Sequence, residues 1–289
     1  MPEEKPKISI ILPTHTNTYR RLQYLKESIG SCLNQTYKDF ELIIVDDCSI
    51  IDIKKTIENY KDSRIKYIRN DKNLGLPNSL NKGFSCARGD YFTWTSDDNK
   101  FAQNALKIML DFLERNPQVD FVYSNYYRID EDGKIIGKTR VKNSKSLEIG
   151  DYIGACFLYK RKIFELIGGY DDTYKLAEDY EYWLRVRKKF KMQKINDFLY
   201  YYRVHNESLT NLYKREVITQ SQKASWEYIS KWARYYHQGL VLFFTKKYKD
   251  ALKMFIISAF LNPLNIRSYY KMFQIFIKIL LGFFNKEEE

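Results

Sequence analysis

The chain has 289 residues, of which 44% are hydrophobic and 29% charged, with only 12 glycines and 6 prolines. This composition excludes collagen-like, low-complexity and disordered classes, and its length suits one large α/β domain with or without an appendage. The formal net charge is +12. From residue 214 to the end, 13 Lys and Arg stand against 6 Asp and Glu, a net +7. The excess positive charge therefore indicates what the surface of this tail contacts more than it indicates a catalytic site.

The cysteines and the N-terminus indicate a cytoplasmic protein. The four cysteines are scattered without C-x-x-C spacing, which predicts reduced, mostly buried thiols rather than a zinc site or disulfides. The charged start "MPEEKPK" leads directly into a predicted strand, so we expect no signal peptide.

Strands and helices alternate through the first 115 residues. The apolar run at residues 8–12 ends at Pro13, and the next segments carry helical spacing and then another apolar run. We expect strands at residues 8–12, 40–45, 65–70 and 91–95, and helices at residues 20–33, 53–60, 79–87 and 102–115. Apolar strands alternating with helices are typical of a parallel sheet covered on both faces.

Two pairs of carboxylates follow predicted strands. Asp46 and Asp47 come after the second strand, and Asp97 and Asp98 end "YFTWTSDDNK". Ligands of parallel sheets bind at the carboxyl ends of strands, so one shared site is plausible. Taken alone, the ten residues also suit an ordinary turn. Two adjacent carboxylates repel each other and, when partly desolvated, need a cation or a hydrogen-bonding ligand.

The second half of the chain reads differently. A strand and a hairpin with its turn at Asp132-Gly133 begin a mixed region. We expect this region to complete the sheet and to form the side of the site that meets an acceptor substrate. From Lys214 the pattern is helical, with a break at Asn262-Pro263. We therefore predict a catalytic domain over residues 1–213 and a basic amphipathic helical region over residues 214–289.

Familiar nucleotide and hydrolase motifs are missing. The sequence has no G-x-G-x-x-G after its first strand, no G-x-x-x-x-G-K-[ST] and no G-x-S-x-G. A site for a phosphorylated ligand without a glycine-rich loop needs another source of positive charge. A divalent metal held by carboxylates, Mn²⁺ or Mg²⁺, is the expected one.

Ordered sequence blocks across residues 7–212 resemble those of family 2 glycosyltransferases. They are "ISIILPTHTN", "LNQTYKDFELIIVDDCS", "NLGLPNSLNKGFSCARGDYFTWTSDDN", "IGGYDDTYKLAEDYEYWLRV" and "YYYRVHNESLT". The resemblance implies an α/β protein of the GT-A (Rossmann-like) fold, a mostly parallel sheet flanked by helices. It also implies an inverting, hexosyltransferase-like enzyme that uses a nucleotide-sugar donor.

The resemblance assigns roles on the donor side residue by residue. Pro13 and Thr14 resemble the contact to the donor nucleotide, and Asp47 resembles the acceptor of hydrogen bonds from the nucleobase. Asp97 resembles the residue near the ribose, and Asp98 the ligand of the metal. An Asx turn after the strand fits Asp46 better than Asp47.

Three later residues complete the implied site. Asp179, flanked by Glu178, resembles the catalytic base, although acidic residues in a first helical turn also complement the helix dipole. Arg203 and His205 resemble the element that meets the diphosphate or the metal; His205 is assigned to the metal, with a structural role as the alternative.

Three positions depart from the family pattern. His15 stands where a tyrosine is common, with one residue inserted, and Thr95 replaces the first acid of the D-x-D-D pattern. Leu80 replaces an arginine near the diphosphate, while Asn81 remains. These departures leave the donor's base and sugar undetermined.

We therefore expect metal-assisted transfer of a sugar, with inversion, to the hydroxyl of a saccharide or lipid-linked acceptor. Synthesis of a surface polysaccharide or glycolipid is the expected setting. A non-catalytic sugar-nucleotide-binding module of the same fold is the alternative; it would lose Asp98 or Asp179, and both are present. A nucleotidyltransferase would need a glycine-rich loop, and no nucleic-acid reader motif accompanies the positive charge.

The tail leaves two compatible alternatives. Its apolar clusters alternate with lysines, and its longest apolar runs are far short of the roughly 20 residues that span a bilayer. Amphipathic helices could pack on the catalytic domain, or they could lie on an anionic membrane at the inner face of the cell membrane, where lipid-linked acceptors would be found.

Overall fold

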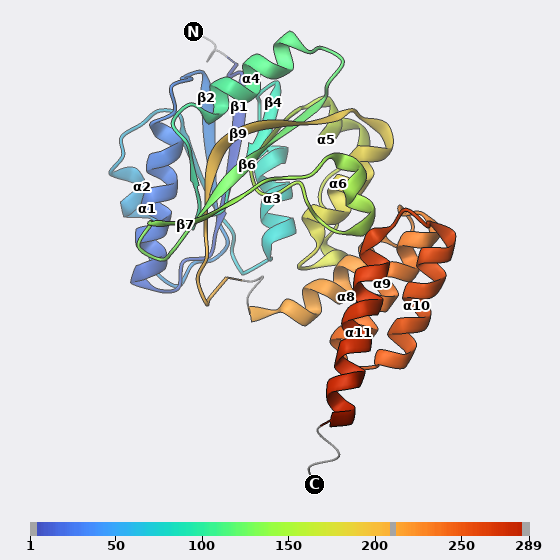
Figure 1. The fold of residues 1–289 in the computed structure, drawn as a ribbon. Helices are drawn as coiled ribbons and strands as arrows, with labels where there is room; N and C mark the ends of the chain where they lie inside the picture. The colour runs from blue at the N-terminus through green and yellow to red at the C-terminus, as the bar shows by residue number, and fades with distance from the viewer. Residues whose placement is uncertain (1–4, 209–211, 285–289) are drawn as a thin grey trace.

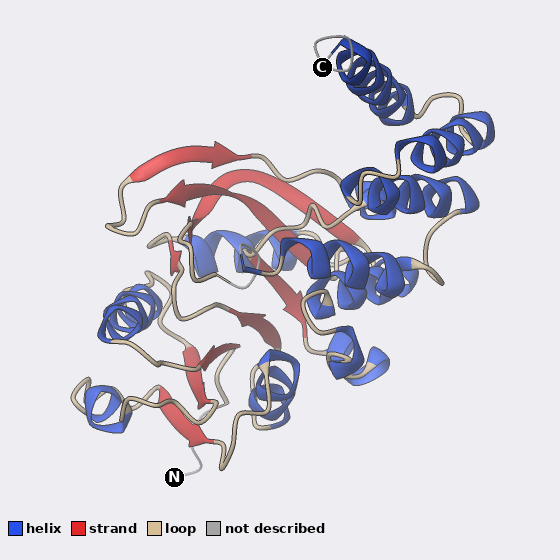
Figure 2. Cartoon of the chain, turned by 90° about the horizontal axis from the view of Figure 1, so that it is seen from below, coloured by secondary structure: helices blue, strands red, loops and turns tan. Residues whose placement is uncertain are grey.

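The computed structural model describes residues 5–208 and 212–284, and its centre is one mixed β-sheet (Figure 1). The strand order is β3-β2-β1-β4-β8-β6-β9-β5, and β7 pairs with the outer part of β6. Helices cover both faces of the sheet, and a helical region lies beside it (Figures 1 and 2). This arrangement places the ends of several strands, distant in sequence, at one edge.

The first half confirms the expected parallel α/β pattern. The strands are β1 (Ile8–Thr14), β2 (Phe40–Asp46), β3 (Ile65–Arg69) and β4 (Tyr91–Trp94), and the helices are α1 (Tyr19–Leu33), α2 (Lys54–Glu58) and α3 (Leu76–Ser85). β1 pairs in parallel with β2 and β4, and β2 with β3. Both β1 and β2 are buried along their whole length, as their apolar runs predict.

Pro13 does not end the first strand as the sequence suggested. It lies inside β1, in register with Val45. The carbonyl of Thr14 accepts from Asp47 on the β2 side, and that of Ile11 accepts from Thr95 on the β4 side. The nitrogen of Pro13 therefore faces the β4 side, beyond the last β1–β4 pair, and its missing N–H costs the sheet no hydrogen bond.

The second half turns the sheet into a mixed one. Its strands are β5 (Lys100–Phe101), β6 (Phe121–Ile129), β7 (Ile135–Thr139), β8 (Phe157–Lys160) and β9 (Met192–Arg203); its helices are α4 (Ala105–Arg115), α5 (Lys162–Ile167) and α6 (Glu178–Lys189), with 3-10 turns η1 (Ser144–Ile149) and η2 (Asp172–Tyr174). β8 runs antiparallel to β4 and β6, whereas β9 runs parallel to β6. The predicted hairpin is confirmed, with Gly133 at φ 87° in its turn.

Two apolar layers enclose the sheet. One lies under α1, α2 and α4, and the other, under α3, α5 and α6, is strongly aromatic. In the second layer Phe121 stacks on Tyr159, and Trp183 packs edge-on against Phe157 at 4.7 Å between ring centroids. Much of the abundant tyrosine is thus core. The four cysteines are free thiols; two are buried and two are half-buried, so the expected burial holds for two of the four.

The C-terminal helices form a small bundle beside the sheet (Figure 2). They are α8 (Lys214–Ser225), α9 (Lys231–Phe244), α10 (Tyr248–Leu261) and α11 (Ile266–Phe284), so the predicted break at Asn262-Pro263 is confirmed. Gly239 lets α9 approach α10, since a Cβ there would lie 2.6 Å from the Phe255 ring. In the described part of the chain no helix is long and apolar enough to cross a membrane.

Candidate active site

The acidic pair Asp97–Asp98 lies just beyond β4, at the carboxyl edge of the parallel strands. Asp97 is buried and accepts from the Thr14 hydroxyl at 2.6 Å and from Nη2 of Arg21 at 2.7 Å. Burial raises the pKa of the Asp97 carboxyl, and the Arg21 charge opposes that rise. Thr14, from the end of β1, and Asp97 are therefore in direct contact, as a shared donor site requires.

Asp98 meets His205 across the same edge. Its Oδ2 lies 3.0 Å from Nε2 of His205, which follows β9. Both side chains are largely buried. A carboxylate oxygen and an imidazole nitrogen at this separation suit one shared cation.

The donor set fits a divalent cation that completes its shell with substrate oxygens. In the described ranges no group of three or more His, Cys, Asp and Glu side chains could hold a metal alone. Such two-ligand sites are usual where a metal also binds phosphates, because Mg²⁺ and its relatives keep positions for phosphate and water. Asp98 and His205 would hold the cation, and the diphosphate would supply the rest.

Arg21 is a site residue that the sequence reasoning missed. It belongs to the first turn of α1, and its guanidinium reaches Asp97 at 2.7 Å and Oδ2 of Asp98 at 3.6 Å. The two carboxylates raise the pKa of Arg21 against the effect of burial. The only sequence signal was an arginine within one turn of the start of a helix that follows the first strand.

Arg203 lies close to the site, but its side chain is engaged elsewhere. Its Nε donates to the Asp98 carbonyl, Nη1 to the carbonyls of Asp130 and Glu131, and Nη2 to the Glu27 carboxylate at 2.7 Å. The side chain is fully buried. With all three nitrogens donating to protein oxygens, Arg203 in this conformation supports the loop that carries Asp98 rather than presenting a charge to a diphosphate.

Asp47 lies beyond the end of β2 and faces the loop before α3. Its carboxylate accepts from the side-chain amide of Asn70 at 2.8 Å and from the backbone N–H groups of Leu74 and Gly75 at 2.7 and 2.8 Å. It is therefore a buried carboxylate surrounded by N–H donors. The Asp47 carboxylate, which accepts hydrogen bonds from the loop before α3, would also suit hydrogen bonds donated by a nucleobase.

The neighbouring Asp46 has the turn role expected of it. It is completely buried, and its carboxylate accepts from the backbone N–H of Ser49 at 2.8 Å, from Tyr67 at 2.6 Å and from Arg69. These partners leave Asp46 pointing into the fold, away from the side of the strand on which Asp47 lies.

A second acidic group opens α6. Asp179 accepts from the backbone N–H of Tyr180, and burial raises the pKa of its carboxyl. Asp151 is exposed as a residue, yet desolvation of its carboxyl and the adjacent Asp179 charge raise its pKa. Sequence reasoning did not find Asp151, which precedes β8 with no recognisable spacing. Two carboxyls this close favour a shared proton at one of them.

Glu178 differs from Asp179 in its surroundings. It is buried, and its Oε2 has no hydrogen-bond partner. Burial, assisted by the Asp179 charge, raises the pKa of Glu178 to about 7. As whole residues, Asp179 is half-buried and Glu178 is buried.

Asn81 connects the donor side to the acidic start of α6. Its side-chain amide donates to the carbonyl of Tyr170 at 2.7 Å and accepts from the N–H of Tyr170 at 2.8 Å. The Tyr170 hydroxyl in turn accepts from Nε1 of Trp94 at 2.9 Å, at the carboxyl end of β4. The Tyr170 ring also stacks on Tyr182 of α6, with 4.3 Å between ring centroids, so α6 lies beside the same edge of the sheet.

Comparison with known proteins identifies the family. The family model described as glycosyl transferase family 2 matches residues 9–168. The chain belongs to this family. An uncharacterized glycosyltransferase of Methanocaldococcus jannaschii is 33% identical over 214 residues, which cover 70% of this chain and 72% of that protein. One from Rickettsia bellii is 35% identical over 152 residues, and the match spans only 20% of that longer protein.

A solved structure confirms the fold expected for family 2. The crystal structure of S. aureus TarS 1–349 in complex with UDP-GlcNAc superimposes with a TM-score of 0.63, covering 93% of this chain and 79% of that one at 16% identity. At this identity the likeness concerns the fold alone. The chain is an α/β protein of the GT-A fold with a helical C-terminal region.

The family 2 departures now have structural meaning. Leu80, in place of the family's arginine, is completely buried in the aromatic layer and offers nothing to a ligand. His15 lies beside the residue that follows β2, with Nδ1 2.9 Å from the Asp47 carbonyl. Thr95 is buried and bonds the Tyr200 hydroxyl at 2.6 Å, so it acts inside the fold. With leucine at residue 80, the arginine whose guanidinium contacts the two carboxylates is Arg21.

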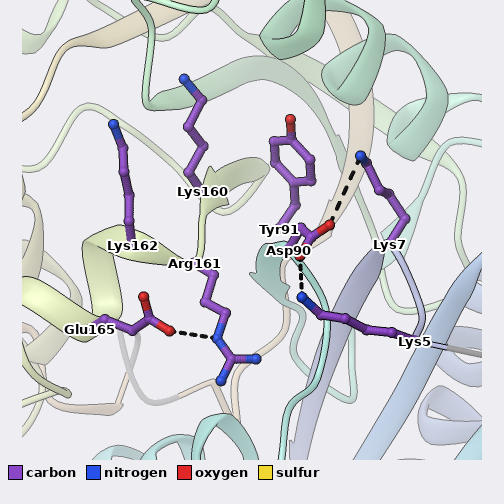
Figure 3. Close-up of a pocket in the computed structure, with 8 residues that line it drawn as sticks. All are labelled: Lys5, Lys7, Asp90, Tyr91, Lys160, Arg161, Lys162 and Glu165. Carbon is purple, nitrogen blue, oxygen red and sulfur yellow. Dashed lines mark hydrogen bonds and ion pairs between the residues drawn. The ribbon is translucent and has the colours of Figure 1, made fainter.

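A basic depression on this family 2 chain lies at the opposite edge of the sheet (Figure 3). Its volume is about 630 Å³, and it is lined by Lys5, Lys7, Asp90, Tyr91, Lys160, Arg161, Lys162 and Glu165. Its cations are paired: Lys5 with Asp90, Lys7 with Glu114, Lys160 and Lys162 with Asp120, and Arg161 with Glu165. Because each of these cations already has a carboxylate partner, we assign the depression no ligand.

Proposed function

We propose that this family 2 glycosyltransferase moves a sugar from a nucleotide-sugar donor to an acceptor hydroxyl, with inversion and with help from Mn²⁺ or Mg²⁺. The observation that carries the proposal is the group Thr14, Arg21, Asp97, Asp98 and His205, drawn together from β1, α1, β4 and β9. It combines an acidic cation site with an arginine at the strand ends where GT-A proteins bind their donors. The complex of TarS with UDP-GlcNAc supports a nucleotide-sugar as the donor class.

On the donor side, the residues of the chain bind and orient. Pro13 and Thr14 line the nucleotide, Asp47 accepts from the base, and Asp97 lies near the ribose. A divalent cation bound to Asp98 and His205 would neutralise the charge that gathers on the departing diphosphate. With Arg203 engaged by protein oxygens, Arg21 is the cation we assign to the diphosphate itself.

On the acceptor side, Asp179 takes the proton. An acceptor hydroxyl is a weak nucleophile, and a carboxylate in hydrogen-bonding reach removes its proton as the bond to the anomeric carbon forms. The elevated pKa of Asp179 makes it a stronger base than an exposed aspartate. One base and one displacement invert the anomeric carbon. The diphosphate needs no proton to leave, so no second acid is required, in contrast to glycoside hydrolysis.

The helical region supports a second part of the proposal, peripheral contact with an anionic membrane. The bundle packs around Tyr236, Ala251, Phe255 and Ile275, but apolar side chains also face outward on α10, α11 and the turn between them. These exposed residues are Ile256, Phe260, Leu261, Leu264, Ile266, Tyr269, Tyr270, Phe273, Phe276 and Ile277. We name them the outer apolar face.

Charge favours a lipid surface for this face. Between residues 246 and 284 the sequence has seven Lys and Arg and one acidic residue. A basic helix pair with exposed aromatic and aliphatic side chains suits the interface of an anionic bilayer. We place the protein in the cytoplasm, at the inner face of the cell membrane, with a saccharide or lipid-linked acceptor of a surface polysaccharide or glycolipid.

The donor proposal is tested by thermal stabilisation. A ligand that binds only the folded protein raises its melting temperature by mass action. Nucleotide-sugars with different bases are screened with Mn²⁺, with Mg²⁺ and with excess chelator. We expect stabilisation by one base class, lost in chelator, and then transfer to an acceptor. Stabilisation without transfer to any acceptor tried would favour a binding module; no stabilisation by any donor would contradict the proposal.

A further inference from the structure

The guanidinium of Arg21 lies where it competes with a metal. It is 2.7 Å from Asp97 and 3.6 Å from Oδ2 of Asp98, the same oxygen that lies 3.0 Å from His205. A cation bound between Asp98 and His205 would therefore have a fixed positive charge beside it. The positive charge of Arg21 would repel the metal ion and weaken its binding, unless an anion lies between the two.

Arg21 is also less enclosed than Arg203. Its side chain is 18% exposed, lies in the first turn of α1 and contacts the two aspartates. Arg203 is fully buried and donates to five groups of the protein through its backbone and side chain. An exchange of partners would cost Arg21 its hydrogen bond to the buried Asp97, whereas it would cost Arg203 four side-chain hydrogen bonds.

We propose that Arg21 is an internal counter-ion that keeps a divalent cation out of the acidic pair until a diphosphate arrives. The diphosphate then supplies the negative charge that lets both cations stay, and the arginine fork passes from Asp97 to phosphate oxygens, whose geometry it matches. Metal and diphosphate thus bind together, each weakly alone. This inference rests on the proposed function, since it concerns the same donor site.

The test measures Mn²⁺ binding to the full chain, by the loss of the free Mn²⁺ signal in electron paramagnetic resonance. It is run without any nucleotide and then with inorganic pyrophosphate, a probe that carries no base. We expect weak binding of Mn²⁺ alone by the unchanged protein. Arg21→Met should bind Mn²⁺ alone about 10- to 100-fold more tightly, the range expected when one competing charged hydrogen bond is removed. With pyrophosphate, the same variant should gain less affinity than the unchanged protein.

Matched variants keep the result specific. Arg20→Met removes the adjacent arginine, which pairs with Glu131 and Asp132 at the surface, and should behave as the unchanged protein. Arg21→Lys keeps a charge and should keep Mn²⁺ affinity low. Adding Asp98→Asn to Arg21→Met should remove the gain, which locates the metal. Should Arg21→Met melt early, Arg21→Gln replaces it.

Two outcomes would overturn the inference. One is a folded Arg21→Met that binds Mn²⁺ no more tightly than the unchanged protein. The other is tight Mn²⁺ binding by the unchanged protein without any phosphate. Neither measurement uses a donor or turnover, so a chain that transfers no sugar could still show the exchange. Conversely, a competent transferase could fail it.

Discussion

Oδ2 of Asp98 and Nε2 of His205 lie 3.0 Å apart although 107 residues separate them in the sequence. One follows β4 and the other follows β9, and these strands are neighbours of β8 and β6 rather than of each other. The short strand β5, which begins two residues after Asp98, pairs antiparallel with β9, and the pairing of Lys100 with Tyr201 brings Asp98 beside His205. The contact combines the two residues that the family resemblance assigned to a metal, and it makes the metal requirement the first property to test.

Asp98→Asn should abolish transfer and sharply weaken metal-dependent donor binding. The variant keeps an oxygen near His205 but loses the charge that a divalent cation needs. Donor affinity is measured by calorimetry with and without Mn²⁺. Asp90→Asn, which alters an exposed carboxylate paired with Lys5 at the opposite edge, is the control and should change neither quantity. Full activity of the unchanged protein in excess chelator would refute the metal requirement.

Asp47→Ala should raise the KM for the nucleotide-sugar by a factor that corresponds to roughly 1–3 kcal/mol. The reason is that an N–H group of the nucleobase would lose the buried carboxylate that accepts its hydrogen bond. The structure adds a cost, since Asp47 also holds Leu74 and Gly75. Asp46→Asn separates the two effects: its partners are all in the fold, so we expect lower stability with little change in KM. An unaltered KM for every donor in Asp47→Ala would place that residue outside the site.

Asp179→Asn should separate chemistry from binding. The amide keeps the shape of the side chain but cannot accept the proton, so kcat should fall about 10²–10⁴-fold. Metal-dependent donor affinity should stay within a few-fold, in contrast to Asp98→Asn. Glu178→Gln is the matched comparison. Normal turnover by Asp179→Asn together with an inactive Glu178→Gln would move the base by one residue, and two active variants would require another carboxylate.

Glu178 should also make stability depend on pH. Its pKa rises from 4.5 to about 7 on folding. Below pH 4.5 the carboxyl is protonated in both states; as pH rises toward 7 the unfolded chain releases the proton while the folded chain retains it. The free energy of unfolding should therefore fall over this window, by up to about 3 kcal/mol.

Urea titrations at a series of pH values measure this dependence. In Glu178→Gln the free energy of unfolding should lack the fall that is due to this carboxyl. Glu165→Gln, which removes an exposed carboxylate of α5 paired with Arg161, should retain that fall. Parallel stability curves for Glu178→Gln and the unchanged protein would mean that Glu178 is ionised in the folded state near neutral pH.

Features of the fold and site that depend on neighbouring residues in the sequence could be predicted, and those that depend on partners far along the chain could not. The parallel strands, the carboxylates after β2 and β4 and the helical tail follow from local pattern and turn chemistry. Arg21 and Asp151 escaped because nothing local marks them: each gains its role from a carboxylate more than 20 residues away. For Arg203 the resemblance implied a contact with the diphosphate or the metal, but Glu27 and two loop carbonyls decide the direction of its side chain.

The outer apolar face should bind anionic vesicles in a salt-sensitive manner. Phe260 and Leu264 are 84% and 89% exposed, so Phe260→Glu and Leu264→Glu should weaken sedimentation with anionic vesicles and leave the fold intact. Leu166→Glu, an exposed apolar position on α5, is the control. Removing residues 240–289 should abolish binding too, but it cuts α9. Equal sedimentation with neutral and anionic vesicles, or none with either, would favour a bundle that serves only to pack on the domain.

The five hydrogen bonds of Arg203 have a consequence for the order in which parts of the protein fold. Arg203 ends β9, whose parallel pairing with β6 joins Phe121 to Met192, and its side chain holds the loop of Asp98 and the helix of Glu27. Pairing over such a separation is slow and comes late in folding. A nascent chain on the ribosome therefore contains β1 to β4 long before it contains the strand that anchors the loop of Asp98. The loop of Asp98 gains the support of Arg203 and His205 only after β9 has been synthesised and has paired with β6.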